Sequence, residues 1–351
     1  MSSLQLDDSR YQHGLQALRG ILALGVFMQH VFWQASTIVP HSTTFLYSLN
    51  VGGTGVLTFF ALSGYLMVGK VTDPPRKYFL DRVRRIFPAF WICVVIATWF
   101  RLGPGFSFRT LPWDVLFLVP NGKPNVLALP HWSLYFEVCF YAIVFAVALL
   151  RPSLGRVVVV LWGILSLALY KRPYDFANYS APNLYNLVFP LYGIFFAAGV
   201  LAGWRFRPSR RSMLGYAAAA LVIFFYPAVL QELAIPYPWP LSHEDVRWAL
   251  YALGCLAAVR AALSWRASSP PGRILKWIGD ASYGMYLIHI LVMARLVPLV
   301  AQRFVPRTYA EAAILIVALT LPPSLLFGYG DVWLQQVLKR VQRRLTPGRH
   351  A

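Results

Sequence analysis

The chain has 351 residues, of which 58% are hydrophobic and only 13% are charged, and its mean hydropathy is +0.55. A soluble globular domain carries about 25% charged residues, so this composition excludes a soluble enzyme or a soluble binding module. The formal net charge of +19 comes from short basic clusters that flank apolar runs. This distribution favours membrane topology and contact with lipid over binding of nucleic acid.

Apolar runs of roughly 17 to 22 residues recur along the chain, and each is long enough to cross a hydrocarbon core of about 30 Å. We predict ten membrane-spanning helices from them, because a helix satisfies its own backbone hydrogen bonds in lipid. The expected spans are residues 15–37, 50–69, 85–101, 131–150, 156–171, 186–204, 213–230, 246–263, 280–300 and 310–330. The fifth is short, and Pro322-Pro323 predicts an interruption of the tenth. The predicted fold is an all-α integral membrane protein with a single domain, a helical core at about residues 15–330 and a basic tail at 339–351.

The side of each loop is predicted from the distribution of Lys and Arg. With ten spans both termini lie on one side, and placing them in the cytoplasm puts most of the 32 basic residues inside, as the positive-inside rule expects. The basic clusters are Lys70–Arg85, Arg205–Arg211, Arg266–Lys276 and Lys339–Arg349. Two longer loops, Leu102–Pro130 and Gln231–Asp245, then lie outside, where they suit recognition of a bulky substrate. The cysteines have no metal-like spacing, so no metal site is expected: Cys93, Cys139 and Cys255.

The first predicted span carries two ionisable side chains, Arg19 and His30. Eleven positions separate them, which on a helix is nearly three turns and about 16 Å along the axis, so both face the same way. Ionisable groups within a span mark functional sites by default, although an interfacial arginine and a hydrogen-bonded core histidine would give the same pattern. In the functional interpretation Arg19 meets a phosphorylated donor near the headgroups, and His30 lies deeper as general base or covalent acyl carrier. The sequence leaves both roles of His30 open.

Five motifs follow one another on successive predicted spans. They are Leu18-Arg19-Gly20 with His30; Gly52–Gly64, which includes Ser63; Phe79–Pro88, which includes Arg82 and Arg85; Trp132–Glu137, which includes Ser133; and Gly279–His289, which includes Ser282 and Tyr286. In this order they resemble the membrane-bound acyltransferase-3 family, and they look most like its branch that acetylates exopolysaccharides and surface glycans. The resemblance implies an O-acyltransferase of the bacterial inner membrane. It would transfer an acyl group, usually acetyl from cytoplasmic acetyl-CoA, to a hydroxyl of a carbohydrate acceptor.

Arg82 and Arg85 are three residues apart and therefore share one helix face. They match the family's Arg-x-x-Arg motif just before Ile-x-Pro, and the resemblance implies that they bind the donor together with Arg19. Guanidinium groups bind phosphates through paired hydrogen bonds, whereas an anchor that sets topology is the structural alternative. Pro88 is expected in the first turn of the third span, where its missing N–H costs little.

Glu137 is the only acid within the fourth predicted span, and Ser133, four residues earlier, is on the same helix face. A carboxylate at this depth is expected to be protonated or paired with a cation or a histidine. We expect Glu137 to support His30 or to bind the hydroxyls of the acceptor. A structural hydrogen bond between spans is the alternative.

Ser282, Tyr286 and His289 form one polar stripe on the ninth predicted span, because they stand at i, i+4 and i+7. His289 is expected to be architectural rather than catalytic. Ser63 and the glycines around it are expected to shape the site by permitting close helix approach.

The sequence-based hypothesis is an O-acetyltransferase whose catalytic residues are His30 and Glu137 and whose partners are membrane lipids, acyl-CoA and a carbohydrate or lipid-linked glycan. A transporter or flippase of a glycan precursor, with His30, Glu137 and His289 as a proton relay, is the alternative from another class. Transporters often contain repeated halves, and no repeat is recognised here. A non-catalytic scaffold is a third possibility. The identity of the acceptor, the length of the acyl group, the side of acceptor entry and the oligomeric state stay open.

Overall fold

The computed structural model describes residues 8–39, 45–70, 74–120, 122, 127–150, 152–170, 175–176, 180–204, 206, 209–301 and 303–345. These residues are mostly helical and contain no strand. The longer helices are α1 (Asp8–Ile38), α3 (Val51–Val68), α4 (Pro75–Leu102), α6 (Trp132–Leu150), α7 (Gly155–Leu169), α10 (Gly193–Gly203), α11 (Arg210–Glu232), α12 (Glu244–Ser264), α13 (Pro270–Ala301) and α14 (Tyr309–Leu345). Short helices in the connections are α2 (Phe45–Ser48), α5 (Trp113–Leu116), α9 (Leu184–Val188), η1 (Gly103–Gly105), η2 (Phe108–Thr110) and η3 (Pro152–Leu154).

Eight segments of the described chain are long and apolar enough to cross a membrane. They are His13–Ile38, Pro75–Gly105, Trp132–Leu150, Leu184–Gly203, Arg210–Glu232, Glu244–Ser264, Pro270–Val300 and Tyr309–Gln342. Val51–Met67 and Gly155–Leu169 are shorter apolar helices at the second and fifth predicted spans. The prediction of an all-α membrane protein is confirmed, while the count of ten spans, the side of the termini and the single domain stay predictions. Parts of the predicted basic clusters and of the loop 102–130 lie outside the described residues, namely 71–73, 121, 123–126, 205, 207–208 and 346–351.

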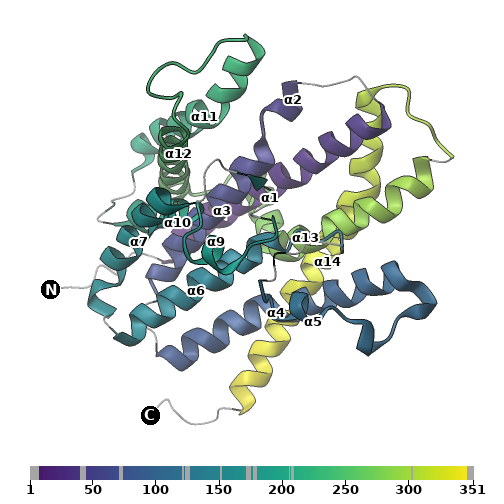
Figure 1. Ribbon diagram of the computed structural model, residues 1–351, viewed down its shortest axis with the longest axis horizontal. Coiled ribbons are helices and arrows are strands. Elements are labelled where there is room, and N and C mark those ends of the chain that lie inside the picture. Colours follow the sequence, from purple (N-terminus) through teal and green to yellow (C-terminus); the bar gives the residue numbers. More distant parts are fainter. Residues whose placement is uncertain are drawn as a thin grey trace.

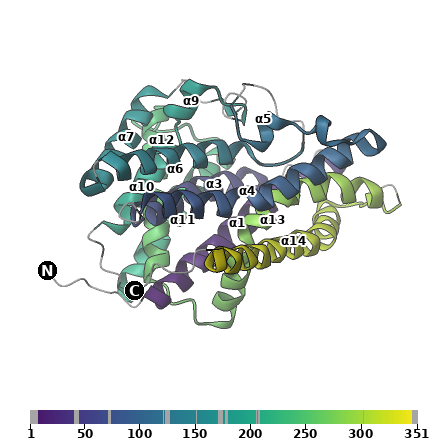
Figure 2. The same ribbon diagram turned by 90° about the horizontal axis from the view of Figure 1, so that it is seen from below.

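The bundle is organised around a close crossing of α1 with α13. A Cβ atom on Gly279 would lie 1.8 Å from the carbonyl oxygen of Gln16, and one on Gly20 would lie 2.0 Å from that of Leu275. Glycine is therefore required at both positions, because it alone lets the two backbones approach so closely. Helices α3, α12 and α14 also contact α1, and α10 packs on α3 (Figures 1 and 2). This crossing fixes the first turns of α1 against the first turns of α13.

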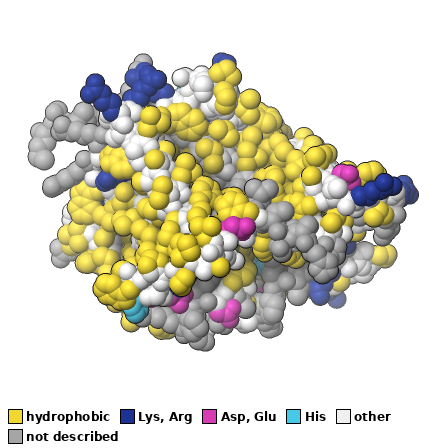
Figure 3. All heavy atoms as spheres, turned by 90° about the horizontal axis from the view of Figure 1, so that it is seen from above, with side chains coloured by type: hydrophobic (Ala, Val, Ile, Leu, Met, Phe, Trp, Pro, Cys, Tyr) yellow, Lys and Arg dark blue, Asp and Glu magenta, His cyan; other side chains and the backbone are white. Residues whose placement is uncertain are grey.

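One end of the bundle collects the starts of α1, α4, α11 and α13 together with the end of α14 (Figure 1). We call it the basic end, because exposed Lys and Arg side chains are concentrated there: Arg76, Lys77, Arg210, Arg211, Arg266, Arg273, Lys339 and Arg340. Between the ends the surface is broadly apolar, with Lys and Arg gathered at its edges (Figure 3). A lipid-facing surface flanked by charged rims has this distribution.

Pro88 lies in the interior of α4 and not in a first turn, because the helix begins at Pro75. The predicted position of Pro88 is therefore wrong, and its ring removes the N–H that would otherwise bond to the carbonyl of Arg84. Gln335 of α14 supplies the missing donor, since its Nε2 donates to that carbonyl at 2.9 Å. The proline thus creates an acceptor through which α14 is attached to α4.

The predicted interruption at Pro322-Pro323 does not occur, because α14 continues through both prolines. The hydroxyls of Thr320 and Ser324 donate to carbonyls one turn earlier, at 2.7 and 2.6 Å. Proline is tolerated in spanning helices where such side chains and local adjustments accommodate the freed backbone groups. The helix consequently extends to the basic end, where it reaches the arginine motif of α4.

Candidate functional site

A pocket of about 140 Å³ lies between α1, α3, α4, α6 and α13. Its lining includes every predicted site residue except His30 and His289, namely Arg19, Ser63, Arg82, Arg85, Ser133, Glu137, Ser282 and Tyr286. Apolar side chains such as Phe59 and Leu62 complete the walls. Residues from spans far apart in the sequence therefore meet in one place. A narrow, mostly apolar pocket with a few convergent polar groups is the usual form of a small-molecule site.

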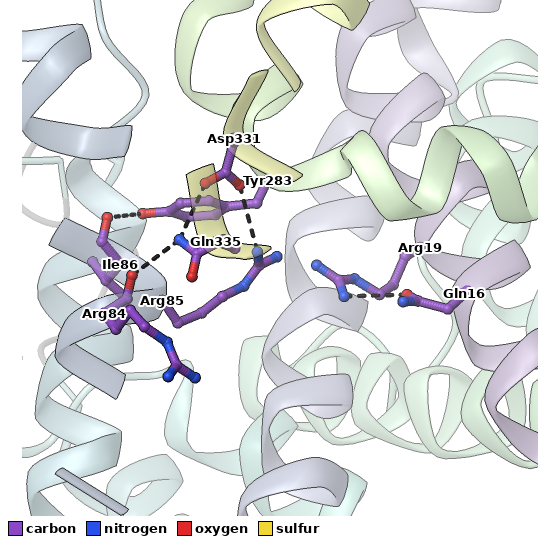
Figure 4. A network of polar contacts seen from close by, with 8 residues as sticks. All are labelled: Gln16, Arg19, Arg84, Arg85, Ile86, Tyr283, Asp331 and Gln335. Atoms are coloured by element: carbon purple, nitrogen blue, oxygen red, sulfur yellow. Dashed lines mark hydrogen bonds and ion pairs between the residues drawn. The ribbon is translucent and has the colours of Figure 1, made fainter. Parts of the chain in front are cut away.

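Arg19 enters the pocket from α1 and is half-buried. Its Nη1 donates to Oε1 of Gln16, one turn earlier, at 3.1 Å. Its charge interacts with those of Arg85 and Glu137, and Figure 4 shows the guanidinium groups of Arg19 and Arg85 facing each other. Two like charges at close range repel each other, so the site contains an excess of positive charge that an anionic ligand would relieve.

Arg85 is held in place by α13 and α14 (Figure 4). Its Nη1 donates to Oδ2 of Asp331 at 3.4 Å, and its guanidinium carbon lies 4.9 Å from the ring centre of Tyr283. Asp331 is only 4% exposed and also accepts from Gln335 at 3.2 Å. The side chain of Arg85 is thus pre-positioned at the pocket wall by an ion pair and by stacking on an aromatic ring.

Sequence reasoning missed Asp331 and Gln335. Both follow the tenth predicted span, whose expected end is residue 330. The available signal was their spacing, since an acid and an amide four residues apart share a helix face within an otherwise apolar stretch. Their partners on α4 lie about 250 positions away in the chain, with sequence separations of 246 and 251.

Arg82 has the least satisfied guanidinium group of the three. Its Nη1 contacts Sδ of Met67 at 3.4 Å, and its guanidinium carbon lies 5.9 Å and 5.5 Å from the ring centres of Tyr78 and Tyr141. Its Nε is buried and has no hydrogen-bond partner among the described residues. A buried donor without a partner costs about 1–3 kcal/mol, so this group favours the binding of an additional acceptor.

The polar groups of α6 continue the site away from the basic end. Glu137 accepts a hydrogen bond from the hydroxyl of Tyr141, and Ser133 is hydrogen-bonded to the hydroxyl of Tyr286 at 2.8 Å. Tyr286 also donates to the carbonyl of Pro130 at 2.9 Å. The bond between Ser133 and Tyr286 joins α6 to α13 at the wall of the pocket.

His30 and His289 lie together beyond Tyr286. Their ring centres are 5.1 Å apart, and the rings of Tyr286 and His289 are 5.9 Å apart. His289 is 1% exposed; its Nδ1 is 2.7 Å from the carbonyl of Tyr286, and its Nε2 is buried without a partner in the described part of the chain. Because Nδ1 donates to that carbonyl, Nε2 is left as an acceptor. His289 therefore contacts His30 directly, which its spacing alone did not indicate.

The predicted support of His30 by Glu137 is not a direct contact. Among the described residues no hydrogen bond or ion pair joins Glu137 to His30; Glu137 instead interacts with Tyr141 and with the charge of Arg19. Ser282 lines the pocket, and its buried Oγ has no partner among the residues described. The site thus has two parts, which are an arginine-lined pocket and a deeper histidine pair. The described residues contain no group of three or more His, Cys, Asp or Glu side chains placed to hold a metal ion.

Comparisons with known proteins bear on this arrangement. The sequence model of the acyltransferase-3 family, described as "Acyltransferase domain", matches residues 12–329. The chain is 28% identical over 266 residues to "Exopolysaccharide production protein ExoZ" of Rhizobium meliloti (strain 1021), covering 70% of this chain and 77% of that protein. It is 26% identical over 308 residues to "Putative membrane-bound transacylase BcsY" of Komagataeibacter xylinus, covering 78% of this chain and 71% of that protein. No solved structure matches the chain.

Proposed function

We propose that this chain, which belongs to the acyltransferase-3 family of membrane-bound O-acyltransferases, moves an acetyl group from acetyl-CoA to a hydroxyl of an exported polysaccharide. The family and the reaction class follow from a match that covers nearly the whole chain. The choice of acceptor is supported by the relative named for exopolysaccharide production. The choice of donor is supported by the pocket, whose free cationic groups suit the phosphates of a CoA thioester.

The observation that carries the proposal is that the three arginines around the pocket differ in their hydrogen-bond and ion-pair partners. Arg85 is already paired with Asp331, whereas Arg82 has a buried Nε without a partner and forms no ion pair within the part of the chain that the structure describes. Arg82 is therefore the group that gains most from a phosphate. Arg19 lines the same pocket, where its charge interacts with those of Arg85 and Glu137, and it adds a second cation for the same anion. The apolar part of the pocket suits the extended arm that carries the thioester.

The histidine pair lies deeper, where it suits the chemical step. In direct transfer, neutral His30 accepts the proton of the acceptor hydroxyl while that oxygen attacks the thioester carbonyl. The C–S bond then breaks, and the CoA thiolate takes up the proton from His30. In the relay, a nitrogen of neutral His30 attacks the thioester carbonyl, the C–S bond breaks, and the thiolate takes up the ring proton of His30. The acceptor hydroxyl then attacks the acyl-histidine, the C–N bond breaks, and the proton of the hydroxyl returns to the ring of His30. The Nε2 of His289 can accept a hydrogen bond from the ring N–H of His30, which would select the ring nitrogen of His30 that faces the substrate.

The orientation in the membrane belongs to the same proposal. Acetyl-CoA is consumed from the side of the basic end, which we assign to the cytoplasm on the positive-inside rule. In this orientation the termini would lie inside, and we assign the protein to the inner membrane of a bacterium. Glu137 supports the site from within the pocket by keeping Tyr141 and Arg19 in place, and Ser63, Ser133, Ser282 and Tyr286 shape its walls.

The test uses purified protein in lipid nanodiscs with radiolabelled acetyl-CoA, followed by release of CoA and transfer of label to polysaccharide. We expect His30→Ala to reduce turnover at least about 100-fold while donor binding is kept, since general base catalysis contributes about 10²- to 10⁴-fold. Arg82→Ala should instead weaken donor binding about 10-fold or more, because a charge-assisted hydrogen bond contributes about 1.5–3 kcal/mol. Arg101→Ala is the matched control, because Arg101 is an exposed arginine near the opposite end of the same helix. Full turnover in a folded His30→Ala variant would refute the central role of His30, and no consumption of acetyl-CoA would favour transport.

A further inference from the structure

A second cavity, of about 410 Å³, lies on the far side of the wall formed by α1 and α3. Its lining comes from α1, α3, α11 and α12 and is almost wholly apolar, with small residues such as Gly25, Gly55, Ala217 and Ala258. Helix α11 packs chiefly against α12 (Figure 1), and the cavity lies between α11 and α1. We call this space the α11 groove.

The α11 groove and the candidate site share the helix that carries Arg19 and His30. Leu18 and Leu22 face the groove, whereas Arg19, which lies between them in the sequence, faces the site. Gly55 of α3 sits against this helix, where a Cβ atom would lie 3.2 Å from the carbonyl oxygen of Leu22. Whatever fills the groove therefore supports α1 directly behind the arginine.

At the basic end two exposed arginines stand close in sequence to residues that line the α11 groove. Arg210 is three residues before Met213, which lines the groove, so the two side chains share one face of α11. Arg266 directly follows Trp265, which lines the groove from the end of α12. An apolar groove that reaches the basic end of the bundle, where such cations are near, is complementary to a molecule with a hydrocarbon chain and an anionic head.

The length of the α11 groove is that of one chain from a single leaflet. Its lining on α11 extends from Met213 to Phe225, which is about 18 Å along the helix axis. Half of a hydrocarbon core is about 15 Å. The groove therefore takes an acyl chain that enters at the basic end and stops near the bilayer centre.

We propose that the α11 groove binds one acyl chain of an anionic phospholipid, whose phosphate is held by Arg210 and Arg266. The bound lipid fills the space behind α1 and stabilises the contact of α1 with α3. The proposal does not depend on the identity of the donor or the acceptor of the acyl transfer.

The test is native mass spectrometry of the purified full chain with phosphatidylglycerol, compared with phosphatidylcholine of the same acyl chains. We expect the wild type to retain phosphatidylglycerol at least fivefold more than phosphatidylcholine. Ala217→Phe fills the groove and should reduce retention at least fivefold, whereas Ala218→Phe, at an exposed neighbouring position, should leave it unchanged. Ala261→Phe on α12 repeats the test if the first variant does not fold.

The headgroup is tested separately with Arg210→Glu and Arg266→Glu together, against Arg76→Glu and Lys77→Glu as a control at another part of the basic end. Only the first pair should abolish the preference for phosphatidylglycerol. Equal retention of both lipids would overturn the assignment of an anionic head. Unchanged retention in the groove-filling variants would overturn the site itself.

Discussion

The attachment of α14 to α4 gives the sharpest test of how this fold positions the arginine motif. Pro88 lacks the N–H that would bond to the carbonyl of Arg84, and Gln335 donates to that carbonyl at 2.9 Å. Replacing Gln335 with Leu leaves a half-buried acceptor without a partner and removes one bond to Asp331. Each loss costs about 1 kcal/mol, and an unpaired buried group costs about 1–3 kcal/mol, so we expect Gln335→Leu to destabilise the protein by about 2–3 kcal/mol.

The proline makes the test specific. In a Pro88→Ala background the restored N–H can bond to the carbonyl of Arg84, so Gln335→Leu should then cost only the bond to Asp331, about 1 kcal/mol. The coupling energy of the double-mutant cycle is thus expected to be about 1–2 kcal/mol. The assay is unfolding of the four variants in mixed detergent micelles, followed by circular dichroism. Gln336→Leu is the matched control, because Gln336 is an exposed glutamine on the same turn of α14. Equal effects of Gln335→Leu in the two backgrounds would show that the proline is not the reason for this contact.

Two further predictions concern packing and pH. Gly279→Ala places a Cβ atom 1.8 Å from the carbonyl oxygen of Gln16, so it should lower the free energy of unfolding by at least about 1–3 kcal/mol. Gly330→Ala is the control, because a Cβ atom there meets nothing within 4 Å. Equal melting temperatures of the two variants would contradict the close crossing of α1 with α13. Burial lowers the pKa of His131, just outside α6, to about 4 from its ordinary 6.5, while its Nδ1 is hydrogen-bonded to the carbonyl of Leu129. The neutral form is favoured in the folded state, so its contribution to stability is complete above pH 6.5 and is lost as the pH falls towards 4. His131→Asn does not titrate there, so its melting temperature should fall less than that of the wild type over this pH range, and parallel curves would contradict the reasoning.

Much of the membrane fold could be predicted from the sequence, because hydrocarbon permits few backbone conformations. Each predicted apolar run corresponds to an apolar helical segment, although the sixth is divided between α9 and α10. Two others, Val51–Met67 and Gly155–Leu169, are shorter than the segments that are long enough to span. Helix ends were predicted less well. Helix α4, which contains the third predicted span, begins at Pro75, ten residues before the expected start, because nearly three turns that carry charged residues outside the apolar run continue the same hydrogen-bond ladder. That extension is what changes Pro88 from a harmless first-turn residue into the origin of a tertiary contact.

The candidate site, too, could be predicted only in part. Side chains on one helix, such as Arg82 and Arg85, could be assigned to a common face from their spacing. Which helices meet could not be derived from spacing, because it depends on close approaches such as that of Gly279 to α1. The contact of His30 with His289 is of this second kind, as is the ion pair of Arg85 with Asp331. Such partners are found only when the packing of the helices is known.

The arginines of this site differ more in their partners than in their positions. An arginine that is already paired, as Arg85 is with Asp331, gains little net energy from an incoming anion, because the anion must compete with a carboxylate for the same donors. Among the described residues the guanidinium of Arg82 contacts a sulfur and two aromatic rings, and its buried Nε keeps a hydrogen bond to give to a ligand. Under the proposed function, the fixed arginine would supply a field of constant direction, and Arg82 would supply binding energy that is realised only when the donor is present. One arginine of each kind on a single helix face would then separate the orientation of the donor from its capture, and the histidines would receive a thioester whose position has already been set.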